Sequence, residues 1–227
     1  MSEHRGIAIA MRRYGAELLI VFVGVYAAFW VESCRDKRQN EERTEQIVLT
    51  LRQDLQDYVM TTARFNAEIE NRLGAWNASR ASGEMPAPYV FRIEGSETPP
   101  IAVWEAVSQS SLVELLEPNL LFDLGFFYSE MEGVGKKYVR YTEFADARVM
   151  PGLKVGNEWF YDSDSGALRP EFAAHMDRLR DLRQDQLRLL DWAQCLARRL
   201  DRYQERTDTC RRSLTGPGAG RNADNGR

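Results

Sequence analysis

The 227-residue sequence is poor in the side chains that most often carry chemistry. It has two histidines and three cysteines, and none of them share a spacing typical of a metal site. It also lacks a nucleophile elbow, a phosphate-binding loop and any histidine–carboxylate constellation. We therefore expect no metal, no cofactor and no catalytic residues. The odd number of cysteines predicts ordinary thiols, with Cys34 the one candidate for an intermolecular bridge in an oxidising compartment.

An excess of basic residues is absent as well. The 30 Lys and Arg residues are outnumbered by 34 Asp and Glu residues, which gives a net charge of −4. A nucleic-acid-binding surface normally carries a basic excess, so we expect no nucleic-acid partner. The 28% of charged residues is typical of a well-solvated helical protein.

Long hydrophobic runs are missing except for one. Residues 14–31 contain a single charge, at Glu17, and a helix of about 20 apolar residues is needed to cross a bilayer. Tyr26, Phe29 and Trp30 enrich one end in aromatic side chains, as at a membrane interface. We therefore expect a short tail over 1–13 and a transmembrane helix over 14–32.

Two alternatives to an uncleaved anchor remain open. The run is consistent with a buried core helix, or with a cleaved signal peptide in which Cys34 is the lipidation site. Glu32 argues against lipidation because a small or apolar residue is usual at that place. An uncleaved anchor is the interpretation that we carry forward.

Small residues lie along one face of the expected span. At 3.6 residues per turn, Glu17, Val21, Gly24 and Ala28 share that face, and the Gly24/Ala28 pair allows a second helix to approach closely. A carboxylate inside a span usually faces protein or water. The pattern predicts association through this face with a second copy or with another membrane protein. The alternative for Glu17 is an acid that reaches the headgroups.

The rest of the chain reads as one helical domain over 33–213. Apolar residues recur at spacings of three and four, as in Leu51, Leu55 and Tyr58. We expect helices over 33–82, 101–116, 118–148 and 169–213, loops over 83–100 and 149–168, and a disordered tail over 214–227. The two long helices are of similar expected length, which predicts an all-α fold: a transmembrane helix that continues into an elongated antiparallel three- or four-helix bundle.

Three local patterns in the domain need interpretation. The alternating run over 89–93 has no convincing partner strand, so we expect an ordered loop over the bundle. The acidic segment over 162–166 has its glycine at the wrong place for a calcium loop and is predicted to be a turn. His175 and Gln186 are polar exceptions in the seam of the last helix, and we expect His175 to be partly exposed.

The N-terminal pattern resembles an uncharacterised bacterial family of single-span membrane proteins. The resemblance rests on Gly15-x-Glu17, six apolar residues, Gly24 and a small residue four positions later, followed by a long charged helix. A second region, with Trp104-Glu105-Ala106-Val107-Ser108 and the helix around Leu121 and Tyr128, is similar to that family too. The resemblance covers about half of the chain. It implies a bacterial inner-membrane location and an all-helical domain, and it brings no known activity.

Two classes of function fit these observations. The first is a membrane-anchored structural or interaction protein that associates through its span and bundle. The second is a sensor or binding module whose aromatic residues line a pocket between helices: Trp104, Phe127, Tyr128, Tyr138 and Tyr141. We favour the first, because aromatics at helical spacing usually form core. The Lys and Arg residues flanking the span are nearly balanced, and large domains translocate largely regardless of such charges, so we expect a cytoplasmic N-terminus and a periplasmic bundle.

Overall fold

The computed structural model describes the backbone of residues 3–93, 101–203 and 210, and the side chains of these residues from 22 onward except 111–112. The chain forms two compact units, Met1–Gln46 and Ile47–Arg227, which are described separately. Within the described residues every regular element is helical and no strand is formed. The predicted all-α class is therefore confirmed.

The first unit is part of helix α1 (Glu3–Ala81). Large apolar side chains are exposed here around most of the helix, except on the face of Gly24 and Ala28: Phe22, Val23, Val25, Tyr26, Phe29, Trp30 and Val31. In the part of the chain with described side chains, no helical stretch is long and apolar enough for a membrane span. Residues 14–21 of the predicted span, including Glu17 and Val21 of the predicted association face, lie outside that part. Gly24 and Ala28 are described and exposed.

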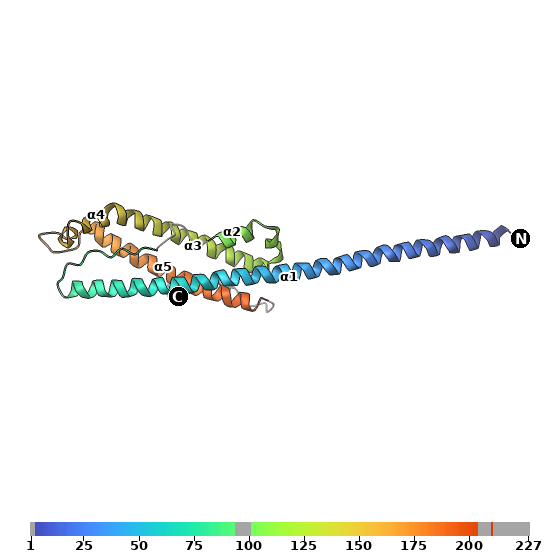
Figure 1. Cartoon of the computed structure of the whole chain (residues 1–227), viewed down its shortest axis with the longest axis horizontal. Helices are drawn as coiled ribbons and strands as arrows, with labels where there is room; N and C mark the ends of the chain where they lie inside the picture. Colours follow the sequence, from blue (N-terminus) through green and yellow to red (C-terminus); the bar gives the residue numbers. More distant parts are fainter. Residues whose placement is uncertain (1–2, 94–100, 204–209, 211–227) are drawn as a thin grey trace, which may run out of the picture. The chain divides into compact units, whose positions relative to one another are not determined.

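The second unit is a bundle of three long helices: the part of α1 from Ile47 onward, α3 (Pro118–Phe144) and α5 (Pro170–Asp201). Figure 1 shows α5 running antiparallel to both α1 and α3. Short α2 (Ala102–Ser108) packs beside α3 at the end of the bundle where α3 begins. Because α1 and α3 run the same way, the chain has to cross the length of the bundle between them.

Several helix boundaries differ from the prediction. The helix expected over 101–116 is two pieces, α2 and the 3-10 helix η1 (Ser111–Leu115). The loop expected over 149–168 contains α4 (Met150–Leu153) and the 3-10 helix η3 (Asn157–Phe160), and a π-helical turn, η2 (Ala145–Val149), joins α3 to α4. The missing side chain at Gly152 explains this compact tip, because the rings of Trp159 and Phe160 occupy the space that a Cβ atom would need.

The ends of α1 and α5 show how the chain leaves each helix. At the C-terminus of α1, the Gly83 N–H bonds the Arg80 carbonyl and the Glu84 N–H bonds the Ser79 carbonyl, with Gly83 at a φ of 87°. This is a Schellman ending, which glycine favours because it adopts positive φ without strain. The helix expected over 169–213 ends instead at Asp201, since Arg202 leaves helical geometry with a ψ of 36°.

A disulfide joins Cys195 on α5 to Cys210, with 5.8 Å between the Cα atoms. The expectation of ordinary thiols is therefore wrong for these two residues. The number of cysteines did not indicate this pair, because three cysteines cannot all pair within one chain. The third, Cys34, is free and exposed. Because α5 ends at Asp201, Cys210 lies outside this helix, and its sulfur bonds that of Cys195.

The core has two main clusters separated by a layer of buried polar residues. One cluster includes Leu51, Leu55, Phe127, Trp192 and Leu196, and the other is formed by these buried residues: Ile69, Leu73, Phe91, Tyr141, Met176 and Leu179. Between them in sequence, Thr62 and Asn66 of α1 and Gln186 of α5 are buried. Within the described residues, Asn66 Oδ1 and Gln186 Oε1 accept no hydrogen bond. We refer to Thr62, Asn66 and Gln186 as the polar layer.

Candidate functional site

The five aromatic residues predicted to line one pocket are divided between the two core clusters. Trp104 stacks on Tyr128 with ring centroids 5.1 Å apart, and the Phe127 ring packs edge-on against Tyr128 and Trp192. The Tyr128 hydroxyl donates a 2.6 Å hydrogen bond to Asp54 of α1. Burial raises the pKa of Asp54, and this hydrogen bond opposes the rise. These contacts make the region around Trp104 a packed core.

The other two, Tyr138 and Tyr141, hold an extended segment over residues 84–93, which we call the strap. The Tyr141 hydroxyl accepts a 3.0 Å hydrogen bond from the Phe91 N–H and donates one of 3.3 Å to the Tyr89 carbonyl. The Tyr138 hydroxyl accepts a 2.7 Å bond from the Ile93 N–H. The alternating run over 89–93 is therefore the ordered loop that its pattern predicted.

Three further side chains fix the first half of the strap. Trp76 of α1 donates its indole N–H to the Ala87 carbonyl at 3.0 Å, and Tyr161 donates its hydroxyl to the Pro86 carbonyl at 2.5 Å. His175 of α5 places Nε2 3.2 Å from the Tyr89 carbonyl. A carbonyl can only accept, so Nε2 carries the proton. Side chains from α1, α3 and α5, together with Tyr161, thus form hydrogen bonds with the backbone of the strap.

His175 is the most constrained of these residues. Its imidazole is fully buried and stacks on Tyr141, with ring centroids 4.5 Å apart, and on Phe144. Burial lowers its pKa to about 4; the bond to Tyr89 opposes this shift and the charge of Arg178 adds to it. The prediction of a partly exposed His175 is therefore wrong, because the strap covers it.

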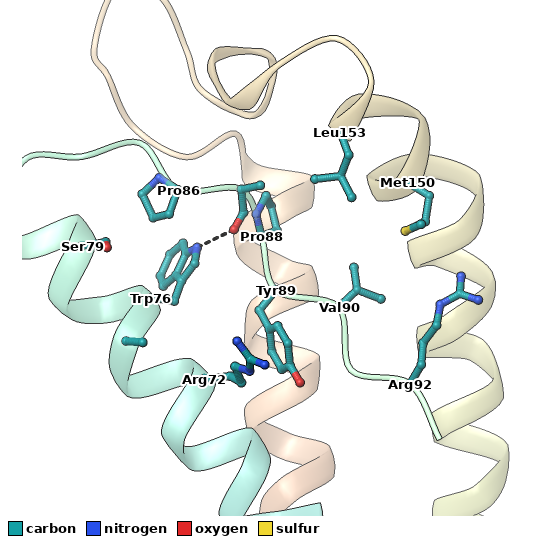
Figure 2. Close-up of a pocket in the computed structure, with 12 residues that line it drawn as sticks. Arg72, Trp76, Ser79, Pro86, Pro88, Tyr89, Val90, Arg92, Met150 and Leu153 are labelled. Atoms are coloured by element: carbon teal, nitrogen blue, oxygen red, sulfur yellow. Dashed lines mark hydrogen bonds between the residues drawn. The ribbon is translucent and has the colours of Figure 1, made fainter. Parts of the chain in front are cut away.

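A surface groove of about 560 Å³ lies over the outer side of the strap. Figure 2 shows α1 along one side of it, with Arg72, Trp76 and Ser79, and Met150 and Leu153 along the other. The strap forms the floor. Most of the lining is apolar, and the volume is in the range of common small-ligand and peptide sites.

The charges that line the groove have one sign. Arg72 and Arg92 line it, and no acidic side chain does among the described residues. Arg92 forms an ion pair with Asp146, whereas no carboxylate lies within ion-pair distance of Arg72 in the described part of the chain. The groove therefore suits a ligand that is apolar along its length and negatively charged at one point.

The described part of the chain offers no comparable site for a metal ion. Among residues with described side chains, no three His, Cys, Asp or Glu groups are placed to hold a metal ion. Asp162 instead accepts hydrogen bonds from the Ser165 N–H and hydroxyl and the Asp164 N–H, and these bonds lower its pKa. The segment over 162–166 is the turn that the sequence predicted.

Comparison of the chain with known protein families, with curated proteins and with solved structures finds no match. The resemblance to a single-span membrane family, drawn from the N-terminal residues, stays a prediction.

The sequence did not indicate the groove, and the structure divides the five predicted pocket residues between the two core clusters. Trp76, Pro88 and Val90 line the groove, yet only the alternating pattern over 89–93 marked this region as unusual. A signal was available in that pattern, because β-branched and aromatic residues at alternate positions are rare in a loop between helices.

Proposed function

We propose that this chain is a single-pass membrane protein that associates with a second copy or with a larger membrane complex through its span and its bundle. Its role on this proposal is assembly and not catalysis. The observation that carries it is the exposure of Phe22, Tyr26, Phe29 and Trp30 in the first unit, each with at least 66% of its surface accessible. Aromatic side chains this exposed need an apolar environment from lipid or from a partner helix.

The disulfide supports the proposed placement of the bundle outside the cytoplasm. Disulfides such as Cys195–Cys210 persist in the bacterial periplasm and are rare in the cytosol. We accordingly propose a cytoplasmic N-terminus, a span over 14–32 and a periplasmic bundle. Alkaline phosphatase fused after Arg211 is then active, and a cytoplasmic reporter at the same place is inactive. The opposite pair of results would reverse the orientation.

Two features of the second unit favour association over ligand sensing in the predicted aromatic pocket. The region around Trp104 is packed, because its ring stacks on Tyr128 and lies against the larger core cluster. One turn apart on α3, Phe122 and Phe126 are 65% and 48% exposed. An exposed apolar pair of this kind is typical of a protein contact.

Association through the span is tested by cross-linking in membranes. The exposed Cys34 thiol reacts with a bismaleimide, so paired chains give a covalent dimer. Substitution Gly24→Ile places a branched side chain on the Gly24/Ala28 face, where the second helix is proposed to approach. It is expected to abolish the dimer, while Gly24→Ala is expected to keep it. Tyr26→Ile, on the opposite side of the helix, is the matched control. Equal cross-linking in Gly24→Ile and Tyr26→Ile would refute self-association through this face.

A further inference from the structure

We propose that the groove over the strap binds an extended polypeptide segment that carries an acidic side chain. The inference rests on the proposed assembly role and adds the chemistry of the partner. It combines three observations: a backbone edge of the strap and an arginine, Arg72, that have no hydrogen-bond or ion-pair partner within the described residues, and an apolar floor between them.

The backbone edge follows from the hydrogen bonds that hold the strap. From Tyr89 onward the bonded groups belong to alternate residues, Tyr89, Phe91 and Ile93, and all point toward α3 and α5. In an extended chain the groups of the intervening residues point the other way. The backbone groups of Val90 and Arg92 accordingly form no hydrogen bond within the described residues, and both residues line the groove.

Such an edge is half of a β-ladder. An extended peptide laid beside it receives hydrogen bonds from the N–H groups of Val90 and Arg92 and donates to their carbonyls, which is the mode of recognition called β-augmentation. Its alternate side chains then face Val90 on the floor of the groove and Met150 and Leu153 along its side. An apolar small molecule satisfies the floor but leaves this edge unpaired.

Charge selects among extended peptides. Arg72 stands on α1 beside the groove without an acidic partner among the described residues, whereas Arg92, on the strap itself, is paired with Asp146. A carboxylate on the peptide supplies the missing partner of Arg72. A lysine or arginine in the same place is repelled by the Arg72 guanidinium group.

The test is a selection of random seven-residue peptides on the full-length protein in detergent, followed by titration of the selected peptides. We expect enriched sequences in which an Asp or Glu accompanies apolar residues at alternate positions. Arg72→Glu is expected to weaken their binding about five- to tenfold, since an attraction becomes a repulsion. Arg64→Glu, two turns earlier on the same helix, is the matched control and leaves binding unchanged.

A second pair of measurements addresses the backbone edge. Val90→Pro removes one N–H that has no partner within the described structure, so it is expected to weaken peptide binding while the helical content stays the same. The same peptides with alternate amides N-methylated are expected to lose binding to the unaltered protein.

Any of four results overturns the proposal. The first two are the absence of any enriched acidic sequence and an equal loss of binding in Arg72→Glu and Arg64→Glu. The other two are equal binding of N-methylated peptides and equal binding of dodecanoate, each of which would show a site that does not recognise a peptide backbone. None of these results affects the span cross-linking experiment, so failure of this proposal and failure of the proposed function are distinguishable.

Discussion

The buried imidazole of His175 makes a quantitative prediction about stability and pH. In the folded chain its pKa is about 4, against an ordinary 6.5. Between these two values the unfolded chain binds a proton that the folded chain does not, so the free energy of unfolding falls as the pH is lowered from about 7 to about 4 and levels off below that. At about 1.4 kcal/mol per pH unit, the loss from this one residue amounts to roughly 3 kcal/mol.

Other groups titrate in the same range, so a variant is needed to isolate the histidine. Asp54 acts in the opposite direction, because its raised pKa lets the folded chain keep a proton longer. His175→Phe retains a ring for stacking between Tyr141 and Phe144 but does not titrate. Subtracting the pH dependence of this variant from that of the original chain leaves the contribution of His175.

The assay is urea unfolding in a mild non-ionic detergent, followed by tryptophan fluorescence at half-unit steps from pH 7.5 to pH 4. We expect the original chain to lose roughly 3 kcal/mol more than His175→Phe over that interval. Parallel curves for the two proteins would refute the argument, because they would mean that the imidazole is solvated or already paired in the folded state.

Three other perturbations have expected outcomes. Replacing Cys195 and Cys210 by serine frees a chain segment spanning 15 positions, which is expected to cost about 3 kcal/mol in urea unfolding, and an unchanged midpoint would show that the bridge is not formed. Tyr138→Phe removes the acceptor of the Ile93 N–H and is expected to speed proteolysis within the strap, with Tyr203→Phe at the far end of the bundle as the control. Gly152→Ala overlaps Trp159 and Phe160 and is expected to cost about 1–3 kcal/mol, whereas Gly133→Ala, with open space around it, is expected to be neutral or stabilising.

Local periodicity predicted the helices well, because the information lies within a few turns. Leu51 and Leu55, one turn apart, are both fully buried, and Pro118 begins α3 as expected. The tip beyond α3 was not predictable in this way. Its form depends on whether the Trp159 ring can lie against the backbone at Gly152, which is a contact between elements.

The candidate site was harder to predict than the fold because its parts are distant in sequence. The bond from His175 to Tyr89 spans 86 positions, and nothing in the sequence around His175 indicates that a strap will cover it. Cys195 is 15 positions from Cys210, and the presence of a third cysteine, Cys34, meant that the count of cysteines did not predict a disulfide. The groove forms only where α1, the strap and α4 pack together, so it could not be predicted from any one segment. The alternating pattern over 89–93 indicated only that the segment at its floor is unusual.

The polar layer has a consequence for how the bundle opens. Buried apolar surface on either side of Thr62, Asn66 and Gln186 belongs to different clusters, so loosening one half exposes its own cluster but leaves most of the apolar surface of the other half buried. Amide hydrogen exchange is therefore expected to divide α1 and α5 near this layer into two cooperative segments. The half that carries the strap would then respond to an occupant of the groove on its own, with slower exchange there and no change around Trp192.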